Sequence, residues 1–366
     1  MRRTGAMAEL KAVVLCAGEG TRLRPLTFSR PKHLLPVAGK SLLGRALDTI
    51  AEAGVVEVAL IVGHQAESVE RHIGAGAAWG VHTTYIRQDK PLGLANAVEC
   101  AREFVGDSPF IVFLGDNLLE RGITQFVDDF RVSGPDAALM LREVEDPERY
   151  GVAELDEGGR VLRVVEKPAE PRTNLAIVGV YAFTNSIFEA ISQIQPSARG
   201  EYEITDAIQW LIDRDRRVSS SILEGFWEDA GEPQALLYAN RIYLERMEPD
   251  VRAEANAGSE LTGTLQVGEG TRIVRTRVVG PCFIGANCVL EDSVVGPYVS
   301  IGDGCQVRNS VIEDAIIQSA SRIINLRAGL KSSVLGEEVV VSGHGHTRMA
   351  PPMHMLLGDM TQIRVI

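Results

Sequence analysis

Hydrophobic positions in the first two thirds of the chain follow two alternating patterns. Strands are expected where short, mostly apolar segments stand between turn residues, and they fall at residues 13–15, 56–63, 82–88 and 109–116. Helices are expected where apolar residues recur at helical spacing, and these segments are residues 41–53, 65–73 and 94–104. Strands that alternate with helices predict an α/β, Rossmann-like domain with a mostly parallel sheet covered on both faces.

Shorter strands dominate after residue 136 and are expected to extend the sheet and to cover a ligand site. They are predicted at residues 137–144, 151–155, 161–166 and 176–184. Helical patterns follow at residues 207–212 and 233–246. We therefore expect a first domain at residues 9–247 and a polar linker at residues 248–263.

A glycine repeat then replaces the α/β pattern. Val, Ile or Leu followed by Gly recurs at short steps, in the pairs Val267-Gly268, Val279-Gly280, Ile284-Gly285, Val295-Gly296, Ile301-Gly302 and Leu335-Gly336. Such hexapeptide repeats are typical of a parallel β-helix, which we place at residues 264–345. The repeat is irregular near residues 313–330, so the number of coils stays open. Residues 346–366 are expected to form a C-terminal tail.

A glycine-rich, basic loop follows the first strand. It runs over about residues 18–42 and is far longer than the ~2 to 6 residues usual between strand and helix. Gly18 and Gly20 permit tight turns, and the basic residues that follow are Arg22, Arg24, Arg30 and Lys32. Backbone amides and guanidinium groups suit the oxygens of a nucleoside triphosphate. Leu23 excludes a dinucleotide fingerprint and Leu34 excludes a P-loop, because each stands where the motif needs glycine. The alternative is an ordinary solvated basic loop.

Composition narrows the class of protein. Hydrophobic residues form 45% of the 366 residues, charged residues form 23%, and the net charge is −12. A negative net charge argues against a general nucleic-acid binder. No apolar run reaches the ~18 residues of a membrane span, and the N-terminus lacks a signal region. We therefore expect a cytoplasmic protein that starts at Met1 or Met7, with reduced thiols at Cys16, Cys100, Cys282, Cys288 and Cys305.

Ligands of parallel α/β sheets lie beyond the carboxyl ends of the strands, where Gly18, Gln88 and Asp116 would all fall. The amide of Gln88 can both donate to and accept from a pyrimidine edge, and Gly93 lets a base approach the backbone. A surface glutamine and a helix-start glycine are the plainer interpretation of these two residues. Asp116 at a strand end suits Mg²⁺, unless it only caps a turn.

Several motifs together resemble one known family. GEGTRLRPLT from Gly18 and PKHLLPV from Pro31 resemble the signature loop of sugar-1-phosphate nucleotidyltransferases. The later motifs, EKP from Glu166, NLAIVGVY from Asn174, RGEYEITD from Arg199 and FWEDAG from Phe226, most resemble the long-form glucose-1-phosphate thymidylyltransferases. The C-terminal repeats resemble left-handed β-helices, including those of acyltransferases.

The resemblance implies that dTTP and α-D-glucose 1-phosphate give dTDP-glucose and pyrophosphate, for deoxysugar synthesis. It implies catalytic roles for Arg22, Lys32, Asp116, Lys167, Arg199 and Asp229. It implies nucleotide contacts from Leu15, Ala17, Gly18, Gly20, Thr21, Arg22, Gln88, Gly93 and Asp116. It implies sugar-phosphate contacts from Asn117, Gly151, Glu166, Lys167, Val178 and Arg199. Asp116 and Asp229 would bind Mg²⁺, with Glu228 as a competing carboxylate for the second position.

The chemistry of that reaction fits the absence of a recognisable nucleophile motif. A sugar phosphate oxygen is already anionic at neutral pH, so positioning and charge neutralisation suffice. Glu166 and Lys167 could also be a strand-end ion pair. Glu203 and Asp206 are expected at a helix start, where carboxylates suit the helix dipole.

Alternatives remain open at this point. They are a uridylyl- or guanylyltransferase acting on another sugar, a bifunctional enzyme whose β-helix is an acyltransferase, and a catalytically silent regulator. Lys40-Ser41 and Ala230 depart from the usual lysine-proline and threonine of the family. His344 and His346 are the available bases for acyl transfer, although surface histidines are the plainer interpretation. We expect the β-helix to serve oligomerisation or regulation, and the protein to be a homo-oligomer.

Overall fold

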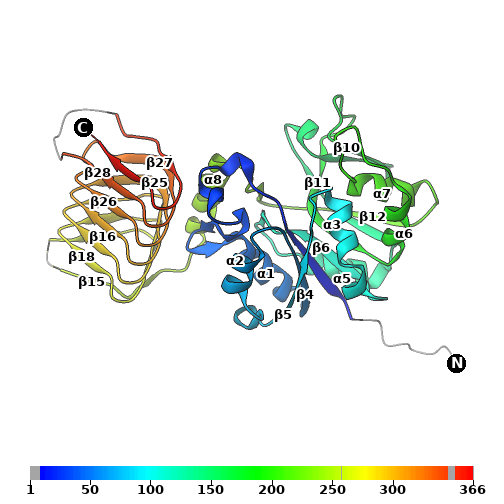
Figure 1. Cartoon of the computed structure of the whole chain (residues 1–366), viewed down its shortest axis with the longest axis horizontal. Helices are drawn as coiled ribbons and strands as arrows, with labels where there is room; N and C mark the ends of the chain where they lie inside the picture. Colours follow the sequence, from blue (N-terminus) through cyan, green and yellow to red (C-terminus); the bar gives the residue numbers. More distant parts are fainter. Residues whose placement is uncertain (1–8, 257, 345–350, 366) are drawn as a thin grey trace. The chain divides into compact units, whose positions relative to one another are not determined.

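The computed structural model describes residues 9–256, 258–344 and 351–365, and the chain forms two compact units (Figure 1). The first unit contains residues 9–18 and Leu43–Trp227. The second contains Glu19–Leu42 and the residues from Glu228 onward. The basic loop therefore belongs to the same unit as the C-terminal repeats, and not to the unit of the sheet it was expected to serve.

A nine-stranded sheet forms the centre of the first unit, with the strand order β10-β9-β11-β6-β1-β4-β5; β8 pairs with β11, and β12 pairs with β8. The strands are β1 (Lys11–Cys16), β4 (Glu57–Val62), β5 (His82–Arg87), β6 (Phe110–Leu114), β8 (Ala137–Glu143), β9 (Gly151–Leu155), β10 (Val161–Glu166), β11 (Leu175–Phe183) and β12 (Val218–Ile222). Pairs β1–β4, β1–β6 and β4–β5 are parallel, whereas β11 is antiparallel to β6, β8 and β9. The expected α/β sheet is confirmed, with an antiparallel extension.

Helices cover this sheet. They are α1 (Leu42–Glu52), α2 (Ala66–Ile73), α3 (Leu94–Cys100), α4 (Arg102–Val105), α5 (Thr124–Ser133), α6 (Ser186–Gln193) and α7 (Ile204–Ile212). Figure 1 shows α6 and α7 side by side next to β12. The helix expected at residues 94–104 is divided near Ala101 into α3 and α4. Phe110 and Phe188 stack in the core with ring centroids 5.4 Å apart, which fixes α6 against β6.

Strand register brings the ends of four parallel strands to one edge. Leu15 of β1 pairs with Leu114 of β6, and Cys16 pairs with Val62 of β4. Val62 in turn pairs with Arg87 of β5. The residues that follow these pairs, including Ala17, Gln88 and Asp116, therefore share the carboxyl edge of the sheet, as the sequence predicts.

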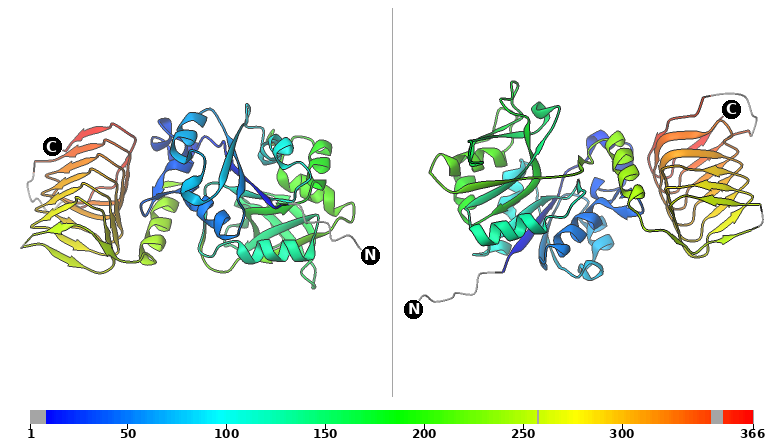
Figure 2. Two further views of the ribbon diagram at one scale, coloured as in Figure 1. Left: turned by 90° about the horizontal axis from the view of Figure 1, so that it is seen from below. Right: turned by 180° about the vertical axis from the view of Figure 1, so that it is seen from behind.

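Short parallel strands stack coil on coil in the second unit, and both views of Figure 2 show their successive layers. The strands are β14 (Asp250–Val251), β15 (Glu254–Ala255), β16 (Glu260–Thr262), β17 (Leu265–Val267), β18 (Arg272–Val274), β19 (Arg277–Val279), β20 (Cys282–Ile284), β21 (Val289–Glu291), β22 (Val294–Val295), β23 (Val299–Ile301), β24 (Gln306–Arg308), β25 (Val311–Ile317), β26 (Arg322–Ile324), β27 (Leu330–Leu335), β28 (Val340–Ser342), β29 (Leu356–Leu357) and β30 (Gln362–Arg364). Buried aliphatic side chains fill the interior of this parallel β-helix.

Strand pairing extends beyond the range expected for the β-helix. β14, β15 and β16 pair with β17, β18 and β19, so residues 248–263 hold strands where a plain linker was expected. β29 and β30 pair with β27 and β28, so described residues of the expected tail also join the stack. Helix α8 (Pro233–Glu245) precedes the first coil.

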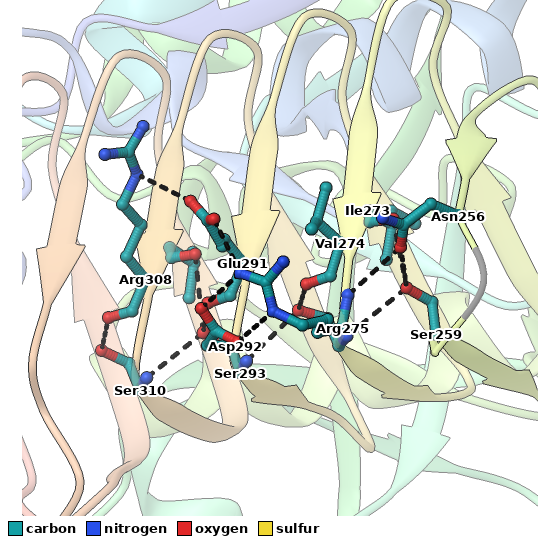
Figure 3. Close-up of polar contacts among 12 residues, drawn as sticks. Asn256, Ser259, Ile273, Val274, Arg275, Glu291, Asp292, Ser293, Arg308 and Ser310 are labelled. Atoms are coloured by element: carbon teal, nitrogen blue, oxygen red, sulfur yellow. Dashed lines mark hydrogen bonds and ion pairs between the residues drawn. The ribbon is translucent and has the colours of Figure 1, made fainter.

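Buried hydroxyl groups satisfy the backbone at one corner of successive coils (Figure 3). The hydroxyls of Ser293 and Ser310 donate to the carbonyls of Glu291 and Arg308, each over 2.7 Å. The backbone N–H of Ser310 donates to the Ser293 hydroxyl over 3.2 Å, which links one coil to the next. The hydroxyls thereby prevent unpaired polar groups inside an apolar interior.

All five cysteines are free, and four of them are buried. Across the described residues, no helix combines the length and the apolar character needed to cross a membrane.

Candidate functional site

Residues 19–42 form an ordered loop with a small buried core of its own. It contains 3₁₀ helices at Thr21–Leu23, Leu26–Phe28 and Lys32–Leu34, and a hairpin of β2 (Pro36–Val37) and β3 (Lys40–Ser41). Gly20 has φ 63°, and a Cβ there would lie 2.9 Å from Cβ of Lys32. Glycine is thus required because the chain turns tightly where the stem of Lys32 passes. The loop therefore brings the residues around Gly20 and Thr21 next to Lys32.

Arg22 lies beside the second expected metal ligand in the second unit. Its guanidinium is 2.9 Å from Oε1 of Glu232 and 3.9 Å from Oδ2 of Asp229. The side chain of Arg22 is 55% exposed, so it is open to an incoming anion. Arg22 and Asp229, more than 200 positions apart in the sequence, are thus neighbours in the second unit.

Asp116 and Asn117 follow β6 in the first unit, where Asn117 begins β7 (Asn117–Leu119). Asp116 is 7% exposed, and its Oδ1 accepts a hydrogen bond of 3.2 Å from Nδ2 of Asn117. Oδ1 of Asn117 accepts a 2.6 Å hydrogen bond from Nε1 of Trp227, in β13 (Trp227–Asp229). The amide of Asn117 is thus engaged on both sides and orients Asp116, and its contact with sugar stays a prediction.

The donor set suits a hard divalent cation. A buried carboxylate such as Asp116 is costly without a compensating positive charge, and carboxylate oxygens are the ligands that Mg²⁺ prefers. Asp229, the other carboxylate of the pair that the resemblance implies, belongs to the second unit. No cluster of three or more His, Cys, Asp or Glu side chains suited to a metal occurs among the described residues. Mg²⁺ does not need such a cluster, since water and substrate phosphates complete its octahedron.

Gln88 and Gly93 lie at the sheet edge, and the structure gives each an additional role. Gln88 is 8% exposed and donates from Nε2 to Oδ1 of Asn96 over 2.8 Å. Gly93 has φ 109°, and a Cβ there would lie 2.5 Å from the carbonyl oxygen of Tyr202. The backbone of Tyr202 also bonds Leu92 and Ala95 on either side. The glycine is therefore required by the approach of the Tyr202 backbone, whether or not a base binds there.

The expected sugar-phosphate residues gather in the first unit. Glu166 pairs with Gly151 across β10 and β9, and its carboxylate is 3.4 Å from the guanidinium of Arg199. Burial, and then the nearby charge of Glu203, raise the pKa of Glu166. Glu203 is itself 3.7 Å from Arg199. Glu203 is the N-cap residue of α7 and Asp206 lies in its first turn, so both stand at a helix start as expected. The Glu203 carboxylate makes no capping hydrogen bond, and it accepts from Ser197 and pairs with Arg199.

The structure also describes Lys167, Val178 and Leu15, which the resemblance assigns to the sugar phosphate or the nucleotide. Lys167 has φ 41°, a left-handed conformation that is rare for lysine and typical of functional positions. Val178 is fully buried in the middle of β11, and Leu15 is 7% exposed near the end of β1. Val178 thus packs in the sheet, so any contact with sugar would come from its backbone.

Arg30 contacts the β-helix, although its place in the basic loop suggests that it binds phosphate. Its guanidinium bonds Asp359, Glu337 and Gln318 of the β-helix. His344 is exposed, and His346 lies outside the described residues. Sequence reasoning had no signal for the partners of Arg30, since Asp359 is 329 positions away.

Comparisons with known proteins show which proteins this chain resembles. The family described as Nucleotidyl transferase matches residues 11–246. A glucose-1-phosphate thymidylyltransferase of Streptomyces antibioticus is 43% identical, over 97% of this chain and 99% of the relative. One from Streptomyces griseus is 41% identical, over 97% and 99%. A solved structure of a candidate glucose-1-phosphate thymidylyltransferase from Bacillus anthracis, in complex with sucrose, superposes with TM-score 0.60 and 35% identity, covering 64% of this chain and 94% of that chain.

Proposed function

Because the chain belongs to the nucleotidyl transferase family, we propose that it transfers the thymidylyl group of dTTP to α-D-glucose 1-phosphate, giving dTDP-glucose and pyrophosphate. The observation that carries this proposal is similarity to thymidylyltransferases along both the sheet unit and the β-helix. The gathering of Gly151, Glu166 and Arg199 supports it, since an anion-binding arginine beside a carboxylate suits a sugar phosphate.

The proposed reaction is an in-line attack by a phosphate oxygen of the sugar on the α-phosphorus of dTTP. That oxygen carries negative charge at neutral pH, so the protein needs no nucleophile and no strong base. Arg22 and Lys32 stabilise the charge that moves onto pyrophosphate, and Lys167 and Arg199 hold the sugar phosphate. Glu166 accepts hydrogen bonds from sugar hydroxyls, and Gln88 contacts the base near Gly93.

A divalent metal is part of the proposal, and Mg²⁺ is the ion that the carboxylate donors favour. Asp116 and Asp229 would hold it, and a bound metal supplies charge neutralisation for the triphosphate. Gly18, Gly20, Thr21 and Ala17 would offer backbone amides to the phosphates.

Homo-oligomerisation and a cytoplasmic location complete the proposal. Nucleoside triphosphates are available inside the cell, and β-helices of hexapeptide repeats offer regular faces for self-association. Sedimentation of the purified full-length chain tests the oligomer directly, and a monomer at micromolar concentration contradicts it.

Product analysis tests the transferase assignment. Incubation with dTTP, glucose 1-phosphate and Mg²⁺ is expected to yield dTDP-glucose, identified by mass and by the anomeric phosphate signal in NMR. Another nucleotide sugar formed faster under competition would replace the assignment with a related uridylyl- or guanylyltransferase. Acetyl transfer from acetyl-CoA to an amino sugar phosphate would add the acyltransferase activity.

A further inference from the structure

Arg30 is a largely buried arginine of the basic loop, and its guanidinium bonds side chains of the β-helix. Its side chain is 16% exposed, and that of Asp359 is 8% exposed. Nη2 and Nε of Arg30 donate to Oδ2 of Asp359 over 2.7 and 3.2 Å. Nη1 donates to Oε1 of Glu337 over 2.7 Å and to Oε1 of Gln318 over 2.9 Å. The hydroxyl of Ser29 also donates to Asp359 over 2.6 Å.

These partners stand at one corner of three successive coils. Ile317 pairs with Leu335, and Leu335 pairs with Leu357, so the residues just after β25, β27 and β29 are stacked. Gln318, Glu337 and Asp359 lie in those positions. Oδ1 of Asp359 also accepts from the backbone N–H of Glu337 over 2.8 Å. One guanidinium therefore spans three coils, and its acceptors are themselves held in place.

The electrostatics of the corner favour a permanent pair. Burial alone would lower the pKa of Arg30, but the hydrogen bonds to Glu337 and Asp359 outweigh it and raise the pKa. Removal of either partner would leave a poorly solvated charge on the other side, which is more costly than the loss of an exposed pair.

Two close contacts with the β-helix lie before and after Arg30 in the loop. A Cβ at Gly358, in the last coil, would lie 2.9 Å from the carbonyl oxygen of Pro25. A Cβ at Gly39 would lie 2.4 Å from the ring of Phe283 in β20. The loop is thus in close contact with the β-helix both before and after Arg30.

A buried amide adds a third attachment. Asn240 of α8 is fully buried, and its Oδ1 accepts from the backbone N–H of Ala38 over 2.9 Å and from the hydroxyl of Ser300 over 2.6 Å. The loop, α8 and the β-helix therefore form one packed body within the second unit.

We propose that the last coils of the β-helix hold the basic loop in its triphosphate-binding conformation, with Arg30 and Asp359 as positioning residues for nucleotidyl transfer. The loop contains only single 3₁₀ turns and one hairpin of two-residue strands, which have little stability of their own, so tertiary contacts decide its shape. Arg22 and Lys32 lie on either side of Arg30 in the sequence, and their spacing depends on that shape. This inference rests on the proposed role of Arg22 and Lys32 in binding dTTP.

The test replaces each side of the pair in the full-length protein. Asp359→Asn keeps an oxygen for the Glu337 N–H but removes the charge, and Arg30→Gln removes the guanidinium. For each, KM for dTTP is expected to rise at least ~10-fold and KM for glucose 1-phosphate to change less than ~2-fold, with the double variant no worse than either single variant. Arg30→Lys, which keeps the charge, is expected to recover part of the loss.

Asp292→Asn is the matched control. Asp292 pairs with Arg275 over 2.7 Å on the exposed surface of the same β-helix, and both partners belong to the β-helix itself (Figure 3). This variant removes the same charge from the same fold and is expected to leave both KM values unchanged. Far-UV circular dichroism and the melting temperature check that every variant is folded.

Limited trypsin digestion without substrate gives a second measurement that does not depend on activity. Asp359→Asn is expected to speed cleavage after Arg22 or Lys32, and Asp292→Asn is not.

If the wild type fails to use dTTP, the proposed function fails, and digestion still reports whether Asp359 orders the loop. Folded variants with unchanged KM for dTTP overturn the inference, whether cleavage accelerates or not. Equal rises in both KM values with a lower melting temperature also overturn it, since they show a general structural defect.

Discussion

Charged side chains of the candidate site neutralise one another in the absence of substrate. Arg22 pairs with Glu232, and Arg199 lies near Glu166, Glu201 and Glu203. The pair of Arg22 and Glu232 is exposed, and exposed ion pairs contribute only about 0 to 1 kcal/mol. A triphosphate can therefore replace Glu232 as the partner of Arg22 at a small cost in free energy. The ion pair is thus compatible with a role of Arg22 in binding.

The metal pair gives the sharpest prediction for single residues. Asp116→Asn and Asp229→Asn keep the side-chain shape but remove a carboxylate charge, so the triphosphate is less well neutralised. We expect turnover to fall at least ~100-fold in each, and the double variant to be far less than additive because the two act as one unit. Steady-state kinetics with dTTP and glucose 1-phosphate measure this.

Glu228→Gln is the control for that prediction, since Glu228 precedes Asp229 in β13. It is expected to retain near-normal turnover. Loss of turnover in Glu228→Gln together with a near-normal Asp229→Asn would identify Glu228 as the ligand instead.

Gln88→Ala is expected to weaken the use of dTTP and to blur selection between bases. Loss of a hydrogen-bond partner that leaves a buried polar group unpaired costs about 1 to 3 kcal/mol of free energy. Competition between dTTP and the other triphosphates gives the measurement. Asn96→Ala, which removes the partner of Gln88 but not the amide itself, is expected to have a smaller effect. An unchanged nucleotide preference in Gln88→Ala would remove this residue from the base pocket.

The raised pKa of Glu166 predicts a pH dependence. Burial, and then the charge of Glu203, raise this pKa, so Glu166 gains its proton at a higher pH than an exposed glutamate would. The protonated form is a weaker acceptor for sugar hydroxyls, so KM for the sugar phosphate is expected to rise as pH falls through that pKa. Glu203→Gln lowers the pKa and should move this acid limb to lower pH.

Glu201→Gln provides the comparison for the pH profile. Glu201 also contacts Arg199, over 3.1 Å, but it is not among the causes of the shift at Glu166. An equal displacement of the acid limb in both variants would mean that the effect passes through Arg199, contrary to the prediction.

At the scale of elements, the sequence predicted the strands and helices of the first unit because their apolar patterns are strong. β9 and β10 have the expected bounds, and β1, β4 and β6 are nearly continuous apolar runs. The first strands of the β-helix were missed, since β14 and β15 have two residues each and both are exposed. Such strands are fixed by pairing with the next coil, which a local pattern does not report.

The start of α3 depends on Gly93, which suggests a test of that element. Gly93→Ala brings a methyl group against the Tyr202 backbone at an unfavourable φ of 109°. We expect it to destabilise the protein by at least ~1 to 3 kcal/mol more than Gly134→Ala. Gly134 has φ 54° and ψ 51°, in the left-handed helical region, and no neighbour within 4 Å of an added Cβ. The difference between the two variants therefore reports the Tyr202 contact together with the less favourable backbone of Gly93. Urea denaturation compares the two, and equal losses would contradict the role given to Tyr202.

At the scale of the whole molecule, the sequence motifs predicted an α/β domain and a β-helix. They did not predict that the basic loop groups with the β-helix. The loop was expected to belong to residues 9–247, whereas it groups with α8 and the β-helix. Arg30, Gly39 and Gly358 explain this grouping, and each acts through a partner distant in sequence. Composition and periodicity report local structure, so contacts of this kind become visible only in three dimensions.

The central claim is that this chain forms a nucleotide sugar from dTTP and glucose 1-phosphate. Pyrophosphate release by the purified full-length protein with Mg²⁺, across dTTP, UTP and GTP against several sugar 1-phosphates, tests it most directly. We expect the highest kcat/KM for dTTP with glucose 1-phosphate, and its loss in Asp116→Asn. Pyrophosphate release no greater than that of Asp116→Asn for every pair of substrates would show that the chain is not a nucleotidyltransferase.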